Sequence, residues 1–335
     1  MKPKIFITRK LPGEVISKIA EYYEVEVWKD YQPPPRRVLS EKIKTIDALG
    51  SLLTDKIDKA LLDEAPNIRI IAQYAVGYDN IDVEECTKRG IYVTNTPGVL
   101  TEAVADLTWA LILAVARRIV EADRFVRSGA WEETRTGWHP TMMLGVDVHG
   151  KVLGVVGLGR IGSAVARRAK CFNMKILYYD VERKLELEKE LGAEYVDLDY
   201  LLSNSDFVTL HVPLTKATHH LIGERELKIM KPTAYLINTS RGAVVDERAL
   251  IKALEKGWIA GAALDVFEVE PTPKDNPLLK FYNVIVAPHI GSASRETRER
   301  MAMMVAENLI AFAKGEIPPN LVNFEVTKIR PPGFD

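Results

Sequence analysis

Short apolar runs alternate with stretches of helical spacing along the first hundred residues. The apolar runs predict strands at 4–8, 25–28, 47–53, 69–72 and 91–94. Helical spacing predicts helices at 12–23 and 56–64, and Pro33, Pro34 and Pro35 predict an extended connection over 31–37. This alternation is typical of a parallel sheet covered by helices.

A long helix is expected next, over 101–127. Its middle is apolar nearly all round, so we expect both of its faces to be buried, one on its own sheet and the other on a second copy of the chain. The stretch 128–150 holds Trp131, Trp138 and His139 and is too long for a simple connection. We therefore expect a homodimer formed through the helix at 101–127. The stretch 128–150 is expected to be an arm or a functional loop, whose Trp138 could reach the active site of the partner subunit.

A second alternating unit begins at Lys151. Apolar runs predict strands at 152–156, 175–179, 207–210, 234–238, 259–264 and 284–286. A last helix is expected over 294–314. The pattern thus predicts two α/β units, with a hinge at 97–102 and a second crossing point at the start of the last helix.

Composition excludes several classes of protein. The 335 residues contain 45 Lys and Arg against 46 Asp and Glu, and this near-zero net charge disfavours a nucleic-acid binder. The most apolar stretch, 107–116, is far shorter than the ~20 residues that span a bilayer. Cys86 and Cys171 form no Cys-x-x-Cys motif, which favours the reducing cytoplasm. Glutamine occurs only at 32 and 73, and such depletion of amides resembles proteins adapted to heat.

A glycine motif follows the first strand of the second unit. Gly157, Gly159 and Gly162 form G-x-G-x-x-G between the strand and the next predicted helix, and Asp180 ends the following strand. This context is that of a dinucleotide-binding turn. The three glycines permit a tight turn, close approach of a pyrophosphate, and close packing of helix on strand, respectively. The phosphates are expected at the backbone N–H groups of Leu158, Gly159, Arg160 and Ile161.

The cofactor preference depends on the end of that second strand. Asp180 is expected to accept hydrogen bonds from the adenosine ribose, which favours NAD(H). Arg183 and Lys184 follow closely and could bind a 2′-phosphate, so NADP(H) is the alternative.

Polar segments follow three later strands, at 238–242, 264–271 and 287–292. Ligands of open α/β sheets bind at the carboxyl ends of the strands. Arg241, His289 and an acid from either Glu268 or Glu270 are therefore expected to converge where a nicotinamide would lie.

With these segments the chain resembles the D-isomer-specific 2-hydroxyacid dehydrogenase family over nearly its whole length. The resemblance is closest to glyoxylate and hydroxypyruvate reductases, through the segments 50–55 and 75–80. It implies two doubly wound parallel-sheet domains. A Rossmann-type NAD(P)-binding domain, 100–289, would be inserted in a flavodoxin-like substrate domain made of 1–99 and 290–335.

The resemblance also implies roles for single residues. Arg241 matches the arginine that binds the substrate carboxylate and carbonyl, a planar task suited to a guanidinium. Glu270, and not Glu268, matches the family glutamate that orients the histidine. His289 matches the proton donor, which a neighbouring carboxylate keeps charged. NAD(P)H would supply a hydride to a small 2-oxo acid, giving glycolate or D-glycerate.

The remaining expected contacts are peripheral to this trio. The expected substrate contacts are Leu52, Leu53, Val76, Gly77 and Ser292. The further cofactor contacts are Val181, Glu182, Val212, Pro213, Thr239, Ser240, Asp265, Ile290 and Gly291. No metal is expected, because His211, His219 and His220 show no ligand spacing with Cys or Asp.

Two alternatives stay open on sequence alone. Another D-2-hydroxyacid dehydrogenase, of the phosphoglycerate or D-lactate type, would differ in only a few pocket residues. An NAD(H)-sensing module resembling the corepressors that share this fold would bind the cofactor without steady-state turnover.

Overall fold

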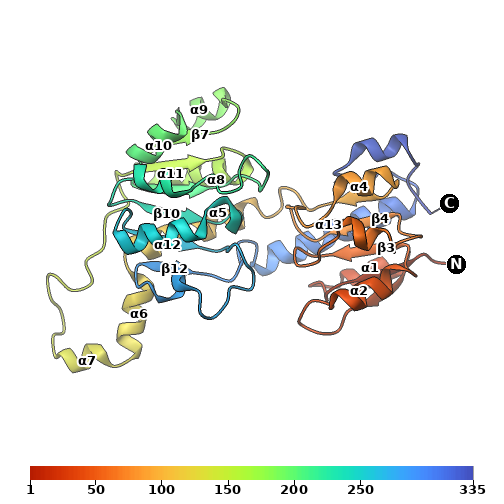
Figure 1. Cartoon of the computed structure of the whole chain (residues 1–335), viewed down its shortest axis with the longest axis horizontal. Coiled ribbons are helices and arrows are strands. Elements are labelled where there is room, and N and C mark those ends of the chain that lie inside the picture. The colour runs from red at the N-terminus through yellow and green to blue at the C-terminus, as the bar shows by residue number, and fades with distance from the viewer. Residues whose placement is uncertain (335) are drawn as a thin grey trace. The chain divides into compact units, whose positions relative to one another are not determined.

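The computed structural model of the chain describes residues 1–334 and divides into two compact α/β units. Unit 1 comprises Met1–Leu100 and Ala293–Asp335, and unit 2 comprises Thr101–Ser292. Unit 2 is thus inserted in the chain of unit 1 (Figure 1). Every named strand pair in both units is parallel, so the expected fold class of two parallel-sheet α/β domains is confirmed.

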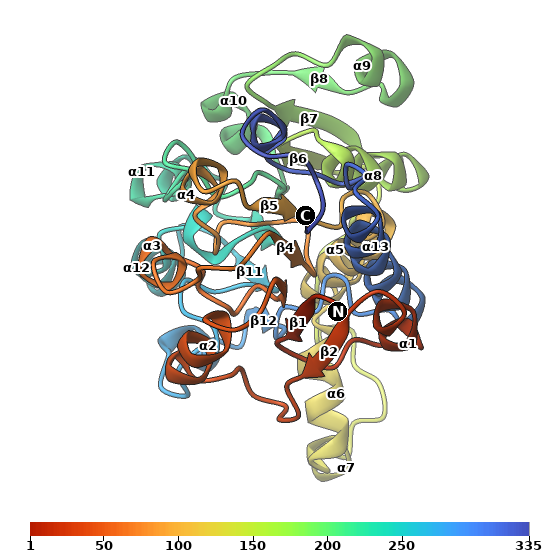
Figure 2. The ribbon, with the colours of Figure 1, turned by 90° about the vertical axis from the view of Figure 1, so that its right-hand side faces the viewer.

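Unit 1 is built on a five-stranded sheet in the order β2-β1-β3-β4-β5. Its strands are β1 (Lys4–Ile7), β2 (Glu24–Val27), β3 (Ala48–Ser51), β4 (Ile70–Gln73) and β5 (Tyr92–Thr94). Its helices are α1 (Val15–Ala20), α2 (Arg36–Ile43), α3 (Lys59–Leu62), α4 (Val83–Lys88) and α13 (Arg295–Ala313). Helices α1 and α13 cover one face of the sheet, and α2, α3 and α4 cover the other (Figure 2).

The C-terminal segment completes unit 1. Ser294 caps α13 by accepting a hydrogen bond from the N–H of Thr297. The hydroxyl of Tyr23 donates to the carbonyl of Leu309 on that helix at 2.7 Å. Farther on, Asn323 accepts from the N–H of Val93 at 2.9 Å and so ties the C-terminal segment to β5.

Unit 2 is built on a seven-stranded sheet in the order β12-β11-β10-β9-β6-β7-β8. Its strands are β6 (Val152–Val156), β7 (Lys175–Tyr179), β8 (Glu194–Tyr195), β9 (Phe207–Leu210), β10 (Tyr235–Asn238), β11 (Gly261–Leu264) and β12 (Val284–Val286). One core lies beneath α5 (Thr101–Ala116), α8 (Arg160–Ala169) and α9 (Leu185–Leu191). A second core lies beneath α10 (Leu198–Asn204), α11 (Glu224–Ile229) and α12 (Glu247–Lys256).

The prediction of one continuous helix over 101–127 is wrong, because the structure has two helices there. The structure divides it into α5, which ends at Ala116, and α6 (Ile119–Arg127), because Arg118 adopts a left-handed φ of 54° between them. Only α5 is buried, whereas α6 buries no residue. With α7 (Ala130–Thr134), α6 projects away from the sheet of unit 2 as an arm (Figure 1).

Two smaller differences concern short elements. Pro35 ends the extended connection and serves as the N-cap of α2, so this helix begins at Arg36, inside the segment expected to be extended. The two-residue strand β8 was not expected. No helix in the described part of the chain is long and apolar enough to cross a membrane.

Candidate active site of unit 2

The glycine turn joins β6 to α8. Gly157 has a φ of 93°, and a Cβ on it would lie 2.9 Å from the carbonyl oxygen of His211. A Cβ on Gly162 would lie 2.0 Å from the carbonyl oxygen of Gly157, a distance that no side chain permits. By contrast, a Cβ on Gly159 would meet no atom within 4 Å. The turn therefore has no room for a side chain at Gly157 or Gly162, whereas the space beside Gly159 is open to a ligand.

The N-terminus of α8 offers hydrogen-bond donors. No side chain caps this helix. Within residues 1–334, the N–H groups of Gly159, Arg160 and Ile161 donate to no acceptor. The N–H of Leu158, also expected to face a phosphate, instead donates to the carboxylate of Asp180 at 2.8 Å. Free donors at a positive helix end fit a phosphate group.

Asp180 follows β7 and stands beside the glycine turn. Its second carboxylate oxygen accepts from the N–H of Glu182 at 3.4 Å. The two neighbouring cations are already paired, Arg183 with Glu188 at 2.8 Å and Lys184 with Glu182 at 2.9 Å. A 2′-phosphate would have to compete with these glutamates, so the local charges favour the unphosphorylated ribose of NAD(H).

The segment after β10 is fixed by Asn238, of which only 1% is exposed. Its side-chain oxygen accepts from the N–H of Ser240 at 3.0 Å, and its amide donates to the carbonyl of Arg241 at 2.9 Å. The guanidinium of Arg241 donates to the carbonyl of Ser240 at 2.9 Å. Thr239 shares a hydrogen bond of 3.0 Å with Thr108 of α5. A buried amide thus sets the path of the loop that carries Arg241.

Asp265 performs a similar task after β11. Its two carboxylate oxygens each accept at 2.8 Å, one from the N–H of Ile290 and the other from the N–H of Gly291. Burial raises the pKa of Asp265, although these two hydrogen bonds oppose the change. The N–H of His289 also donates to the carbonyl of Asp265, at 2.8 Å. Asp265 therefore anchors the segment that contains His289.

Glu270 and His289 form the central pair. Nδ1 of His289 lies 2.6 Å from Oε2 of Glu270, and the other carboxylate oxygen accepts from the N–H of Phe267 at 3.0 Å. Burial alone would raise the pKa of Glu270. The hydrogen bond and charge of His289, the N–H of Phe267 and the charge of Arg241 together outweigh burial, so the pKa is lowered. In the described part of the chain, Nε2 of His289 has no hydrogen-bond partner, which leaves this nitrogen for a ligand.

His211 follows β9, and the sequence singled it out only as a histidine without metal-ligand spacing. Its ring nitrogen Nε2 is buried and has no partner among the described residues. Burial lowers its pKa to about 3, so the ring is neutral at pH 7. The carbonyl oxygen of His211 lies against Gly157, and its neutral ring supplies no charge.

The other expected contacts are divided between the two units. Val212 and Pro213 follow β9; Val212 is half-buried with its side chain against Gly157, and Pro213 is exposed. Val181 and Glu182 are exposed beyond Asp180, and Ser292 is the last residue of unit 2. The remaining four belong to unit 1, where Leu52 and Leu53 follow β3 and Val76 and Gly77 follow β4, all partly accessible.

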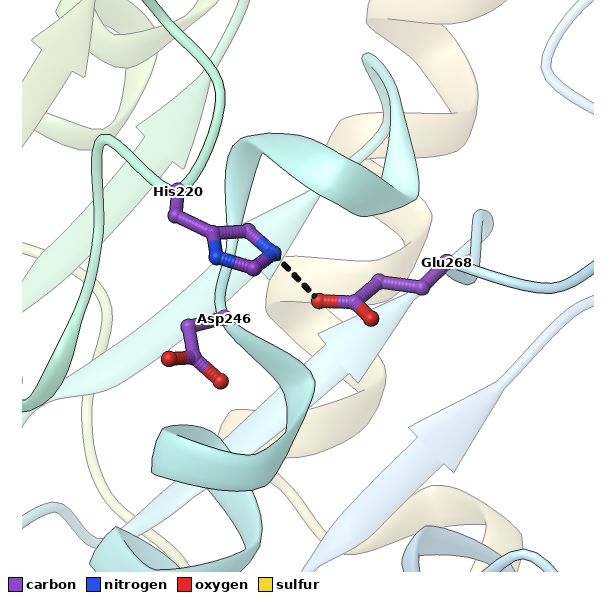
Figure 3. Close-up of side chains that lie close together, drawn as sticks. All are labelled: His220, Asp246 and Glu268. Atoms are coloured by element: carbon purple, nitrogen blue, oxygen red, sulfur yellow. Dashed lines mark hydrogen bonds and ion pairs between the residues drawn. The ribbon is translucent and has the colours of Figure 1, made fainter.

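One cluster escaped the sequence reasoning. His220, Asp246 and Glu268 lie together, with potential ligand atoms within 4.8 Å of one another (Figure 3). Glu268 pairs with Nε2 of His220 at 2.8 Å and accepts from the N–H of Glu247 at 3.0 Å. Asp246 caps α12 through the N–H of Ala249. These hydrogen bonds account for the position of each carboxylate and give Glu268 a role apart from that of Glu270.

Comparison with known proteins identifies the family. The model of the D-isomer specific 2-hydroxyacid dehydrogenase, NAD binding domain, matches residues 109–291, which is more than half of the chain. The chain belongs to the D-isomer-specific 2-hydroxyacid dehydrogenase family. The expected family is thus confirmed, and with it an oxidoreductase that uses NAD(P).

Relatives of high identity cover the whole chain. It is 65% identical over 334 residues to the glyoxylate reductase of Korarchaeum cryptofilum, covering 100% of both chains. It is 66% identical over 332 residues to the glyoxylate reductase of Thermococcus litoralis, covering 99% of this chain and 100% of that one.

A solved structure agrees with this family. The NADPH-dependent glyoxylate/hydroxypyruvate reductase of Sinorhizobium meliloti, in complex with NADP and malonate, is 35% identical with a TM-score of 0.85, over 97% of this chain and 98% of that one.

Proposed function

We propose that this 2-hydroxyacid dehydrogenase is a glyoxylate reductase, which reduces glyoxylate or hydroxypyruvate to glycolate or D-glycerate. The observation that carries the proposal is the pair of His289 and Glu270, 2.6 Å apart, with Nε2 of the histidine free of protein partners among the described residues. The names of relatives that are 65% and 66% identical over essentially the full chain support the substrate class.

The reaction adds a hydride to the carbonyl carbon of a 2-oxo acid and a proton to its oxygen. Bound NAD(P)H supplies the hydride. Arg241 binds the substrate carboxylate and polarises the carbonyl, since its charge opposes the negative charge that develops on the oxygen. His289, protonated on both nitrogens, donates the proton from Nε2. Glu270 holds Nδ1 and so orients the ring and stabilises its positive charge.

The expected cofactor contacts fit a dinucleotide. The phosphates are assigned to the free N–H groups of Gly159, Arg160 and Ile161, and the ribose to Asp180. The Leu158 amide is left to Asp180. We propose NAD(H) as the preferred form and NADP(H) as the alternative, because the cations beside Asp180 are paired with glutamates.

The proposed substrate contacts are Leu52, Leu53, Val76, Gly77 and Ser292. Within residues 1–334, the N–H groups of Val76 and Gly77 donate to no acceptor, which supports their assignment to the carboxylate of the substrate. Leu52 and Leu53 would limit the size of the group beside the carbonyl. These assignments favour a small 2-oxo acid such as glyoxylate over a longer one.

We also propose a homodimer that works in the cytoplasm. The arm at 119–146 exposes Ile119 by 55%, Val126 by 52% and Trp138 by 80%. Ile119 and Val126 lie on α6, which buries none of its own residues, and Trp138 follows α7. Exposed apolar side chains gathered on one arm are costly in water and favour a second copy of the chain. Both cysteines are free, which fits a reducing compartment.

The test is to follow NADH absorbance with purified protein and a panel of glyoxylate, hydroxypyruvate, pyruvate and phosphohydroxypyruvate, repeated with NADPH. Rapid oxidation with glyoxylate or hydroxypyruvate is expected, with NADH the better donor. A preference for pyruvate or for the phosphorylated acid would replace the substrate but keep the mechanism. Binding of NADH without turnover on any acid would contradict the proposed function.

A further inference from the structure

A buried polar network in unit 1 connects the ends of β1, β3 and β4. Three of its members, Thr8, Ser51 and Gln73, have no exposed surface. A fourth, Asp55, is only 3% exposed. Buried polar groups are costly unless each finds a hydrogen-bond partner. The way these partners are distributed therefore shows what the network holds in place.

Gln73 and Asn80 form the centre of this network. The side-chain oxygen of Gln73 accepts from the hydroxyl of Ser51 at 2.7 Å. Its amide nitrogen donates to Oδ1 of Asn80 at 2.7 Å and to the carbonyl of Gly77 at 3.3 Å. Asn80 in turn donates to the carbonyls of Leu52 at 3.1 Å and Asp55 at 2.8 Å. All four N–H groups of the two side-chain amides are thus hydrogen-bonded. Three donate to main-chain carbonyls, and one donates from Gln73 to Asn80.

The segment after β3 is held from both sides. The N–H of Leu52 donates to Oδ2 of Asp55 at 2.7 Å, and the hydroxyl of Thr8 donates to the same oxygen at 2.5 Å. With Asn80 on its carbonyl, Leu52 has both of its main-chain polar groups bound by side chains. Because a peptide unit is planar, fixing the carbonyl of Leu52 also fixes the direction of the N–H of Leu53.

The segment after β4 is held in the same manner. The carbonyl of Ala75 accepts from the N–H of Thr96 at 2.9 Å, and that of Val76 from the side chain of Asn95 at 2.8 Å. Peptide planarity then sets the directions of the N–H groups of Val76 and Gly77, which donate to no acceptor within the described residues. The bond from Gln73 to the carbonyl of Gly77 fixes the next peptide unit.

We propose that Gln73 and Asn80 are positioning residues for substrate recognition. They connect the segment that carries Leu52 and Leu53 to the segment that carries Val76 and Gly77, so that free N–H groups and the apolar wall meet a 2-oxo acid in one fixed arrangement. The proposal rests on the proposed function, because it assigns these two segments to the substrate. Neither residue touches the substrate itself.

The test uses isosteric variants. Asn80→Asp removes both N–H donors and turns carboxylate oxygens toward the carbonyls of Leu52 and Asp55. Gln73→Glu removes the donors to Asn80 and Gly77. The matched control is Asn323→Asp in the same unit, because Asn323 is 3% exposed and donates to Thr87 at 2.8 Å and to the carbonyl of Ile91 at 2.9 Å, away from both segments.

We expect KM for glyoxylate to rise about 10- to 100-fold in Asn80→Asp and Gln73→Glu, since small displacements of binding groups have effects of this size. The Kd for NADH should stay unchanged. Hydrogen exchange should accelerate in peptides covering 52–57 and 74–82. Asn323→Asp should lower Tm while KM stays at the wild-type value.

An unchanged KM in both folded variants would overturn the proposal, as would an equal rise of KM in Asn323→Asp. If the wild-type protein reduces no 2-oxo acid, the proposed function fails on that measurement alone. Hydrogen exchange then decides whether the two amides position these segments, and unchanged exchange at 52–57 and 74–82 in Asn80→Asp would refute it.

Discussion

At the level of single residues, the two nitrogens of the His289 ring have different tasks. Nδ1 is held by Glu270 at 2.6 Å, and Nε2 is left to the substrate. His289 itself adopts a left-handed φ of 54°, and its N–H is fixed by the carbonyl of Asp265. An uncommon backbone conformation at a non-glycine residue is maintained here because the neighbouring hydrogen bonds determine it.

Substitution of His289 and of Arg241 should separate chemistry from cofactor binding. His289→Gln removes the proton donor and Arg241→Ala removes the carboxylate ligand, so each should lower kcat/KM for glyoxylate by about 10²- to 10⁴-fold. NADH binding, measured by fluorescence, should persist, because neither side chain belongs to the glycine turn. His139→Gln, on the exposed arm, is the control and should keep wild-type turnover. Turnover near the wild-type value in both site variants would refute the assignment.

The lowered pKa of Glu270 predicts a pH dependence of stability. Its carboxylate is stabilised in the folded protein, so it contributes to stability above its unfolded pKa, and the contribution is lost as the pH falls through the lower folded pKa. The difference in Tm between the wild type and Glu270→Gln should be present at about pH 6 and should shrink below about pH 4. Thermal unfolding across this range measures it.

Glu268→Gln provides the comparison for that experiment. Glu268 binds His220 and not His289, so this variant should keep turnover while Glu270→Gln loses about 10- to 100-fold in kcat. If the difference in Tm between the wild type and Glu270→Gln grew toward low pH, the pKa of Glu270 would not be lowered by folding, and the assignment would be wrong.

Sequence reasoning reached the residues at strand ends but not the amides that position them. Arg241, His289 and the acid at 268 or 270 each stand in a segment directly after an apolar strand, so parallel topology predicted that they converge. Only the resemblance to the family selected Glu270 over Glu268. Asn238 could not be assigned a role, because its bonds to Ser240 and Arg241 depend on the exact path of the loop. The link from Asn80 to Leu52 joins residues 28 positions apart and leaves no local pattern.

At the level of elements, two glycines of the β6–α8 turn have different roles: Gly162 allows close packing, and Gly159 leaves space for the cofactor. Gly162→Ala should lower Tm strongly, because its Cβ would lie 2.0 Å from the carbonyl oxygen of Gly157. Gly159→Ala should leave Tm nearly unchanged, since nothing lies within 4 Å of that Cβ, yet it should weaken NADH binding by occupying the space in front of the turn. Calorimetry and a fluorescence titration test both expectations. Unchanged NADH affinity in Gly159→Ala would mean that the phosphates lie elsewhere.

Element boundaries were predictable only where the sequence marks them. Ser294 marks the start of α13, and both its existence and its bounds agree with the apolar pattern. The break between α5 and α6 has no glycine or proline, since the residue at the turn is Arg118. Apolar spacing continues across it because α6 has an apolar face of its own, and only the exposure of that face distinguishes the two helices.

At the level of the whole molecule, the exposed face of α6 predicts an effect on assembly. Ile119→Glu with Val126→Glu places charges on the proposed dimer surface and should shift the protein from dimer to monomer in sedimentation velocity at micromolar concentration. Ile317→Glu, at an apolar residue of unit 1 that is 52% exposed, is the matched control and should leave the dimer intact. A wild-type monomer under the same conditions would refute the dimer.

The division of the chain into two alternating α/β units was predictable from periodicity alone, because parallel strands buried on both faces form short continuous apolar runs. The order of strands in each sheet was not, since a run of apolar residues does not specify its neighbours. The resemblance to a known family implied two doubly wound domains, one inserted in the other, and the structure supplied the strand order.

The return of the chain into unit 1 has a consequence for its synthesis. Residues 1–100 leave the ribosome well before α13, whose Leu309 and Phe312 are fully buried in the finished unit. At typical elongation rates, the 192 residues of Thr101–Ser292 take about 10 to 40 s to emerge. During that interval the first five strands have no C-terminal helix to cover one face, because α13 follows the whole inserted unit in the chain. The nascent N-terminal segment is therefore the part of this protein that most needs a chaperone.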